Sequence, residues 1–410
     1  MDQFVIESTK KDVAPKAMKN GLTRFEEILE HNHGVLDNIL HTLDPKLHSL
    51  GYLFVLKAKI SDSRKNQQSY ITQVINFIQV ATSEQIKAAP VHCKHLGDLL
   101  HQLRQPARGV LPLKHAICAL TDRPSQLTPI HSDFLILCIL SKSYHVAMPV
   151  ITNSITDVNP EQTSIAIKDV LAYFYYAGIV FATMKKHKQA LESFKQVWTA
   201  PAHALSAIAI ESYKKYYLVF LSVHGTTPGF PKYTPFVVQR TIKNHCKTYI
   251  DFGTCYLSGN MAEINTKFHQ NAETFQKDNN IGLVKLSIRS IHRRNIKKLT
   301  QTFMTLSIRD IADNVKLSPA DAEAIVLKMI EDGEIFATIS QKDGMVTFHE
   351  NPQSFSGHSI LNELEQQING VVSLETKLRA IDEQFSVSTP YLKRLLNAEK
   401  KMSSQYDSYF

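Results

Sequence analysis

The sequence has few of the features that mark secreted or membrane-spanning proteins. Its 410 residues include an odd, scattered set of five cysteines: Cys93, Cys118, Cys138, Cys246 and Cys255. A disulfide framework needs paired and regularly spaced cysteines, so we expect reduced core thiols in a protein of the cytoplasm or nucleus. The longest strongly apolar run, residues 134–140, is far shorter than a membrane span. The first sixteen residues carry charges throughout and lack the apolar core of a secretory signal.

The motifs of nucleotide-binding enzymes and hydrolases are also missing. The sequence contains no glycine-rich phosphate loop and no nucleophile elbow. Its apolar fraction of 43% and charged fraction of 20% are those of an ordered globular chain. The net charge of +8 is mild for this length and suits an acidic protein surface as well as nucleic acid. We therefore expect a folded binding protein with no catalytic residue and no cofactor.

One histidine pattern is similar to a catalytic zinc site. His31, His33, His41 and Asp44 approximate the His-x-His and Ser-x-x-Asp spacing of JAMM metalloproteases. A catalytic zinc takes two imidazoles, a carboxylate and a water in the open position. In this sequence a histidine replaces the serine, and the residues after His33 have helical periodicity. Surface and cap positions on short helices explain the pattern better, whereas an enzyme would require zinc at His31, His33 and Asp44.

A second stretch rich in histidine and cysteine begins at residue 91. Residues 91–95 read VHCKH, and His101, His115 and Cys118 follow. Zinc fingers need paired Cys-x-x-Cys or His-x(3–5)-His spacing, which this stretch lacks. We predict ordinary helical surface and core at these positions and no metal site.

The first 280 residues predict an all-helical repeat architecture. Short helical faces alternate with prolines at roughly the interval of helix hairpins. Small and large residues between residues 170 and 202 have the spacing of a tetratricopeptide-type helix pair. They are Gly178, Phe181, Ala190, Phe194 and Pro201. One such unit cannot bury its own face, so we expect stacked neighbours in a right-handed solenoid whose concave face holds further partners. The next predicted helices are residues 211–223, 237–249, 261–276 and 282–302.

Residues 307–350 carry the signals of a winged helix. Ser307 and Ser318 are helix-capping residues, each with an aspartate at the third helical position, and Gly333 ends the second helix. Two runs rich in β-branched and aromatic residues, 335–340 and 345–350, flank an Asp-Gly pair, which is a strong hairpin signal. This order of helix, helix and hairpin predicts a winged helix with a small β-sheet that caps the solenoid.

The charge of this winged helix favours a protein partner over DNA. Its second helix would face the phosphate backbone, yet it carries a single Lys328 against five acidic residues, which phosphates repel. These are Asp321, Glu323, Glu331, Asp332 and Glu334. The best argument for nucleic acid is a basic run just upstream, which we interpret instead as a solvated face or one that docks on an acidic protein. It comprises Arg289, His292, Arg293, Arg294, Lys297 and Lys298.

A long amphipathic helix is expected after a polar linker at residues 351–357. Apolar residues recur there at coiled-coil spacing, in two short phases interrupted near Gly370. They are Leu361, Leu364, Ile368, Val371, Leu374, Leu378, Ile381 and Phe385. A solitary helix would leave this seam in water, so the helix either bundles with other chains or folds back onto its own solenoid. From Ser386 onward the tail is polar, and we expect it to fray.

Five motifs carry a resemblance. They are residues 278–285 (DNNIGLVK), 329–349 (MIEDGEIFATISQKDGMVTFH), 174–178 (FYYAG), 211–216 (ESYKKY) and 231–234 (PKYT). The first two resemble the PCI family, whose members occur in the proteasome lid, the COP-nine signalosome and translation initiation factor three. The other three are similar to the signalosome members of that family. The match is dense from about residue 165 to 350 and thin elsewhere.

The resemblance implies a non-catalytic scaffold subunit of a complex found in the cytoplasm and nucleus. The implied partners are other signalosome subunits, both PCI subunits and the pair that bears the metalloprotease. The complex removes Nedd8 from cullin-RING ubiquitin ligases, which are further candidate partners, whereas we expect no nucleic acid and no membrane.

Two interfaces follow from these considerations. The C-terminal helices of signalosome subunits bundle together, which implies that the seam is an interface. Winged helices of the family associate side by side, and an unpaired hairpin strand can add to a neighbouring sheet. The expected residues of this hairpin edge are Ile335, Ala337, Ile339, Met345, Thr347 and His349.

These observations divide the chain into five parts. They are an N-terminal helical-repeat region (1–164), the tetratricopeptide-like part of the PCI domain (165–280), its winged-helix part (281–350), a C-terminal bundle helix (358–386) and a flexible tail (387–410). Two alternatives remain open. A subunit of a sister PCI assembly would keep the fold and change the partners. An RNA-binding PCI protein would use the basic run, and its affinity would fall steeply with salt.

Overall fold

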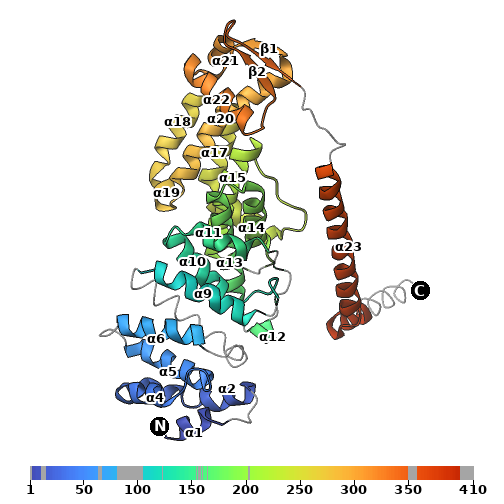
Figure 1. Ribbon diagram of the computed structural model, residues 1–410. Coiled ribbons are helices and arrows are strands. Elements are labelled where there is room, and N and C mark those ends of the chain that lie inside the picture. The colour runs from blue at the N-terminus through green and yellow to red at the C-terminus, as the bar shows by residue number, and fades with distance from the viewer. Residues whose placement is uncertain are drawn as a thin grey trace, which may run out of the picture. The chain divides into compact units, whose positions relative to one another are not determined.

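The chain is mainly helical and divides into two compact units, residues Met1–Lys298 and Leu299–Phe410 (Figure 1). The computed structural model describes residues 2–10, 15–62, 67–80, 105–121, 123–153, 155, 158, 160–163, 165–201, 204–349 and 358–397. The predicted class is confirmed: helical repeats come first, a small β-sheet follows near residues 305–348, and helices end the described chain. Within these ranges no helix is both long and apolar enough to cross a membrane.

The first unit consists of short to medium helices. They are α1 (Asp2–Ser8), α2 (Pro15–Thr23), α3 (Glu26–His31), η1 (His33–Val35), α4 (Leu36–Thr42), α5 (Ser49–Asp62), α6 (Gln67–Val80), α9 (Ala107–Leu120), α10 (Ile130–Leu140), α11 (Tyr144–Ile151) and α12 (Pro160–Thr163). After these come α13 (Ile167–Thr183), α14 (His187–Thr199), α15 (Ala207–His224), α16 (Phe236–His245), α17 (Lys247–Ser258), α18 (Met261–Gln270), α19 (Ala272–Lys277) and α20 (Ile281–Thr302). Helix α20 continues past Lys298 into the second unit.

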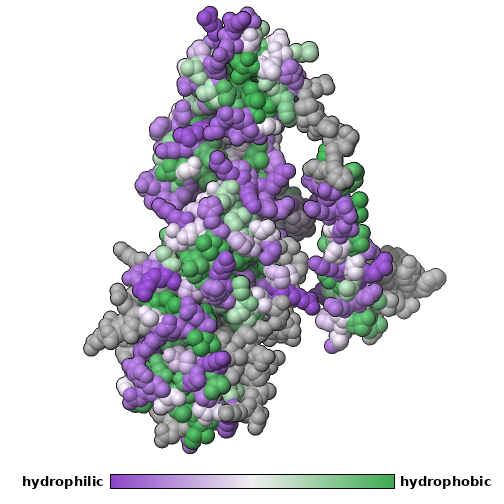
Figure 2. Space-filling model, in the orientation of Figure 1, coloured by the Kyte–Doolittle hydropathy of each residue, from purple (hydrophilic) through white to green (hydrophobic). Residues whose placement is uncertain are grey.

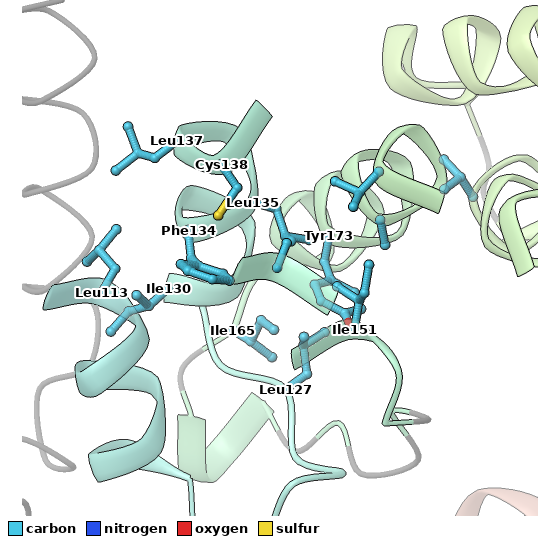
Figure 3. Packing of buried hydrophobic residues seen from close by; sticks show 14 of the residues in the cluster. Leu113, Leu127, Ile130, Phe134, Leu135, Leu137, Cys138, Ile151, Ile165 and Tyr173 are labelled. Carbon is cyan, nitrogen blue, oxygen red and sulfur yellow. The ribbon is translucent and has the colours of Figure 1, made fainter. Parts of the chain in front are cut away.

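These helices pack chiefly on their neighbours in sequence, as repeat proteins do. Helix α9 lies against α10, α13 against α14, and α14 against α15. Helix α10 packs against both α9 and α13 and is apolar on nearly every face. Its Phe134, Leu135 and Cys138 are fully buried (Figure 3). Burial raises the pKa of the Cys138 thiol to about 12, so this cysteine is an inert core residue.

The close approach of α13 and α14 confirms the predicted tetratricopeptide-like pair. Gly178 of α13 faces the ring of Phe194 on α14, and a Cβ atom at this glycine would lie 2.6 Å from the nearest ring carbon. That separation is far below van der Waals contact, so only glycine lets the two helices approach this closely.

Two of the predicted helices are broken in the structure. The expected helix over residues 237–249 bends at Cys246 into α16 and α17, while Val238, Ile242 and Tyr249 stay buried on both sides of the bend. The apolar spacing therefore continues across the break, and periodicity could not reveal it. The expected helix over residues 261–276 divides at Asn271, whose backbone amide and side chain both donate to the carbonyl of Lys267 (3.1 Å each).

The second unit begins with the predicted winged helix. It contains β1 (Thr305–Ser307), α21 (Ile308–Val315), α22 (Pro319–Glu331), β2 (Ala337–Ser340) and β3 (Met345–Phe348). Both predicted caps form. The Ser307 Oγ accepts from the amide of Asp310 (3.0 Å), and the Ser318 Oγ accepts from the amide of Asp321 (3.2 Å). The hairpin turn places Gly344 at φ +62°, a region that glycine adopts without strain.

The sheet has one strand more than the predicted hairpin. Its order is β1-β3-β2, and both pairs are antiparallel. Strand β1 is only three residues long, so it shows no alternating pattern that the sequence could reveal.

The C-terminal part of the second unit is more helical than expected. Helix α23 (His358–Ser386) runs through Gly370 without a break, so the predicted interruption near this glycine is one of the apolar spacing and not of the helix. One glycine inside a helix costs only about 1 kcal/mol, and the rest of this long segment outweighs it. A further helix follows at residues 389–397, where we expected a fraying tail. Its Tyr391 ring lies 5.0 Å from that of Phe385, and Ser388 accepts the first helical hydrogen bond, from Leu392 (3.1 Å).

Candidate protein interfaces

The three-stranded sheet has two edges, and neither of them is β3. Strand β3 pairs with β1 through Thr305 and Thr347 and with β2 through Thr338 and the same Thr347. The part of the predicted hairpin edge on the strand of Met345 and Thr347 is therefore closed, whereas the opposite edge of the hairpin, on β2, lies at the side of the sheet. The available edges belong to β1 and β2.

The outer edge of β2 presents backbone groups that do not bond to β3. His349 donates to the carbonyl of Phe336 (2.8 Å), and hydrogen bonding alternates along an antiparallel pair. The backbone N–H and C=O groups of Thr338 and Ser340 therefore point towards β3, while those of Ala337 and Ile339 point away from it. Both of these residues belong to the predicted hairpin edge, and their backbone groups could pair with one more strand.

The six predicted edge residues lie on opposite faces of the sheet. Ala337 and Ile339 are in register with Phe348 and Val346, whose side chains are buried, so their own side chains face the helices. Ile335 is buried as well. Met345, Thr347 and His349 lie on the other face, where the His349 ring is hydrogen bonded to the Thr338 hydroxyl (2.8 Å). The structure thus places these residues in and beside the two strands of the hairpin but not on one surface.

The predicted seam of α23 is exposed along its whole length. Its eight apolar side chains are between 51% and 66% exposed, and apolar surface is visible along this helix in Figure 2. Every residue from 360 to 386 is in fact exposed, so no described part of the second unit covers either side of the helix. An apolar strip on the order of several hundred Å² is larger than the patches usually left in water and marks an interaction site.

The seam changes direction half way along the helix. Leu361, Leu364, Ile368 and Val371 follow a spacing of three, four and three residues, but Leu374 comes three residues after Val371 instead of four. At 3.6 residues per turn, the second half of the seam is rotated by roughly 90° around the helix from the first half. The sequence shows this step, and the continuous helix turns it into a change of face.

The surface of α22 does not suit DNA. Asp321, Glu331, Asp332 and Glu334 are all exposed, and Lys328 is the one basic side chain on this helix. Phosphates would meet an acidic surface at the position of a recognition helix.

One residue of the basic run of α20, Arg294, makes its contacts inside the first unit. The Arg294 guanidinium donates to the carbonyls of Gly225 (3.3 Å), Tyr256 (3.1 Å) and Leu257 (3.4 Å), and it stacks on the Tyr256 ring at 5.0 Å. Gly225 is the left-handed C-cap of α15, and Tyr256 and Leu257 lie in the last turn of α17. Arg294 therefore stabilises two helix C-termini and is not part of an open basic face.

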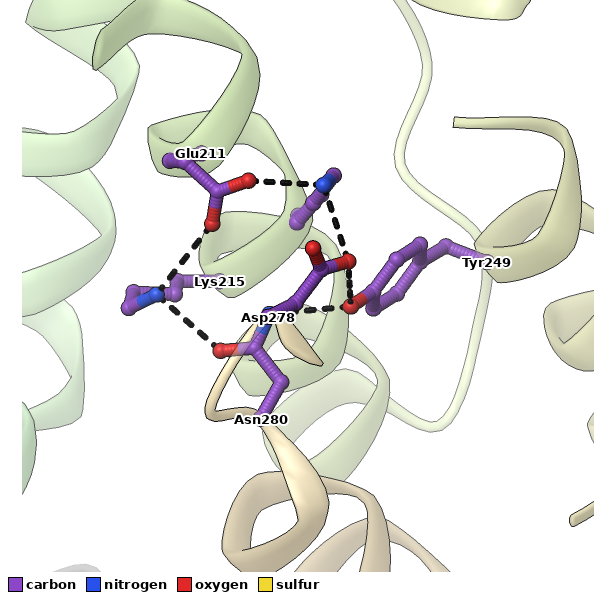
Figure 4. Close-up of polar contacts among 6 residues, drawn as sticks. Glu211, Lys215, Tyr249, Asp278 and Asn280 are labelled. Carbon is purple, nitrogen blue, oxygen red and sulfur yellow. Dashed lines mark hydrogen bonds and ion pairs between the residues drawn. The ribbon is translucent and has the colours of Figure 1, made fainter. Parts of the chain in front are cut away.

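Two of the motifs that carry the resemblance meet in a polar cluster (Figure 4). Lys214 of α15 binds Glu211 of the same helix (2.6 Å) and Asp278 of the turn before α20 (2.8 Å). Tyr249 of α17 donates to the same Asp278 (2.8 Å) and accepts from Asn280 (2.9 Å). These contacts join α15, α17 and the start of α20, so the cluster positions the helix that leads into the winged helix.

The neighbouring Lys215 completes this cluster. Its ammonium donates to Asn280 (3.0 Å) and lies 3.7 Å from Glu211. Burial lowers the pKa of Lys215 and outweighs the nearby carboxylates, whereas burial together with the Asp278 carboxylate raises the pKa of Tyr249. The sequence motifs were visible, but nothing in them indicated that they contact one another.

The histidine patterns do not assemble into a site. The Nδ1 of His31 lies 2.6 Å from the carbonyl of Glu27, and Asp44 accepts from the amide of Lys46 (2.9 Å) in a turn. Across the described ranges, no three metal-ligating side chains gather around one point. His115 and Cys118 are exposed on α9, whereas residues 91–95 and His101 lie outside the described residues.

Comparison with known proteins agrees with this architecture. The family model "COP9 signalosome complex subunit 3, N-terminal helical repeats" matches residues 13–238, and the model "PCI domain" matches residues 268–350. The COP9 signalosome complex subunit 3 of Dictyostelium discoideum is 54% identical to this chain, over 100% of this chain and 98% of that protein.

A less similar relative also matches most of the chain. The COP9 signalosome complex subunit 3 of Arabidopsis thaliana is 36% identical over 92% of this chain and 88% of that protein. The predicted PCI resemblance is therefore confirmed, and the chain belongs to the COP9 signalosome complex subunit 3 family.

Proposed function

We propose that this chain is a non-catalytic scaffold subunit of a COP9 signalosome. The observation that carries the proposal is the seam of α23, since eight half-exposed apolar side chains on one helix require a partner. The relatives are named as subunits of that complex, which supplies suitable partners. These are other PCI subunits and the pair that bears the metalloprotease, with cullin-RING ligases as further contacts, in the cytoplasm and nucleus.

Two surfaces hold the neighbours in this proposal. The seam of α23 packs against helices of other subunits, and the outer edge of β2 adds to the sheet of a neighbouring winged helix through Ala337 and Ile339. Residues 165–280 and 281–350 act together as the PCI domain, residues 1–164 extend the repeats, and residues 358–386 form the bundle helix. Removal of Nedd8 takes place on another subunit.

Affinity purification from the native cell tests this proposal. The tagged chain is immunoprecipitated, and the proteins that accompany it are identified by mass spectrometry. We expect signalosome subunits, including the metalloprotease subunit, and no deneddylase activity from the chain purified alone. Recovery of proteasome-lid or initiation-factor subunits in their place would contradict the proposed function and leave the fold intact.

A further inference from the structure

A group of apolar side chains in the first turn of α16 and the loop before it is exposed to water. Phe236 is 75% exposed, Tyr233 is 65% exposed, and Val237 is 54% exposed. They belong to the loop at residues 225–235 and the first turn of α16, in the first unit. Neither the seam of α23 nor the edge of β2 includes them.

This exposure is imposed by a rigid frame. The Phe230 ring of the same loop stacks on Tyr213 (5.7 Å, interplanar angle 2°) and meets the edge of Trp198 at 5.8 Å. Thr234 is buried, and its carbonyl accepts from the Gln239 side chain (3.0 Å). The residues beside Tyr233 and Phe236 are thus anchored, so the exposed rings present a preorganised surface.

Two lysine ammonium groups lie over aromatic rings of this loop. The Lys195 ammonium of α14 lies 5.8 Å from the centre of the Tyr233 ring, and the Lys243 ammonium of α16 lies 5.7 Å from that of Phe230. Lys232 and Arg240 are exposed between them along the chain. Val238 and Ile242 fill the buried side of α16, which turns its cations outward.

Almost no negative charge balances these cations. Residues 225–250, which include Lys232, Arg240 and Lys243, contain no aspartate or glutamate. Glu192 is the one acidic residue of α14, the helix that carries Lys195. In the part of the chain that the structure describes, Lys195, Lys232, Arg240 and Lys243 form no ion pair with a carboxylate. The surface is therefore apolar at its centre and uncompensated in charge at its rim, which is the composition of a protein-binding site.

We propose that this loop–α16 surface (Tyr233, Phe236 and Val237 with Lys195, Lys232, Arg240 and Lys243) binds an acidic segment of a partner protein that carries a large apolar side chain. The carboxylates of the segment meet the four cations, and the apolar side chain covers Phe236 and Val237. Single-stranded RNA suits the surface less well, because Lys195 lies over the Tyr233 ring and Phe236 is then the one uncovered ring among these three residues on which a base could stack.

A synthetic peptide tests the proposal on the full chain. The probe is a fluorescein-labelled peptide of about twelve residues, rich in aspartate and glutamate, with one phenylalanine and one leucine, and binding is followed by fluorescence anisotropy. Three comparison probes replace the two apolar residues by serine, replace the acids by their amides, or substitute an oligouridine RNA of similar length. Binding is measured at low and high salt, because the charged rim predicts weaker binding at high salt.

Two variants and a matched control locate the binding site. Reversing three cations (Lys232→Glu, Arg240→Glu and Lys243→Glu) is expected to weaken binding of the acidic peptide at least tenfold. Phe236→Ala is expected to weaken it by about three- to tenfold. The control reverses three other exposed lysines (Lys267→Glu, Lys285→Glu and Lys342→Glu), so it has the same net charge, and it should change binding less than about twofold.

Several results would overturn the inference. One is no binding of the acidic peptide at about 1 mM, the weak end of specific affinity. Others are equal weakening by the control variant, or no effect of Phe236→Ala on a peptide that does bind. Tighter binding of the RNA would assign the surface to nucleic acid. None of these results bears on assembly through α23, so this inference and the proposed function can fail separately.

Discussion

Replacing Leu364 and Ile368 of α23 with aspartate should separate assembly of the complex from folding of the chain. Both side chains lie on the first half of the seam and are about half exposed in the free chain. No described part of the second unit packs on them. Their substitution therefore removes contacts that exist only in an assembled complex.

The size of the effect follows from this exposure. Full burial of a leucine or isoleucine contributes about 1.5–3 kcal/mol, so burying the exposed half of each contributes roughly 1 kcal/mol. Burying a carboxylate in the same place costs at least about 1–3 kcal/mol more for each residue. The double variant should therefore lose at least about 4 kcal/mol of binding free energy, which is close to a thousandfold in affinity. The loss of helix propensity is only about 0.5 kcal/mol per residue.

Co-purification with the other signalosome subunits measures the loss of binding, and circular dichroism with thermal unfolding measures any loss of stability of the isolated chain. We expect loss of the variant from the complex and an unchanged melting temperature. The matched control is Gln366→Asp with Ser373→Asp, which adds the same charge on the opposite side of the same helix. This control should assemble as the wild type does.

Entry of the Leu364→Asp, Ile368→Asp variant into the complex at wild-type yield would refute the reasoning, because the seam would then not be an assembly surface. A lower melting temperature of the isolated variant would refute a different step. It would mean that α23 packs on its own chain, as the fold-back alternative requires.

The remaining predictions concern the sheet edge, the close helix pair and a buried histidine. Ala337→Pro removes an outward N–H from the edge of β2 and should weaken pull-down of a neighbouring winged helix at little cost to the fold, whereas Thr338→Pro removes a bond within the sheet and should destabilise it. Gly178→Ala should destabilise the chain by about 1–3 kcal/mol in urea unfolding, because its Cβ would clash with the ring opposite, while Gly282→Ala, with open space around it, should be neutral or stabilising. Burial lowers the pKa of His131 to about 4, so between that pH and about 6.5 the unfolded chain binds the proton and the folded chain does not. The contribution of His131 to the free energy of unfolding is then complete above about pH 6.5 and should fall by roughly 2 kcal/mol at pH 5. His131→Asn should remove this part of the difference in stability between urea unfolding at pH 7 and at pH 5. Equal pH dependence of stability in the wild type and the variant would contradict this prediction.

Much of the winged helix could be predicted because its signals are local. The two serine caps bind amides only three residues away, and the hairpin turn depends on adjacent Asp343 and Gly344. The helix pair around Gly178 was visible for a similar reason, since the spacing of small and large residues repeats within one unit. The α23 seam was read from periodicity alone, and the structure adds that it lies in water.

What the sequence determined by itself is therefore the class of fold, the order of elements and the residues of the seam, because propensity, capping and periodicity act within a few residues. Tertiary structure decided which strand edge is open. Strand β1 has no pattern of its own and becomes part of the sheet only by pairing with residues about forty positions away, which places β3 in the centre. Tertiary structure also decided that Lys214 and Asp278 meet across 64 positions, that Phe236 is held in water, and that Lys195 lies over the nearby Tyr233 ring. Contacts of this kind depend on how distant helices pack, and no local signal encodes that packing.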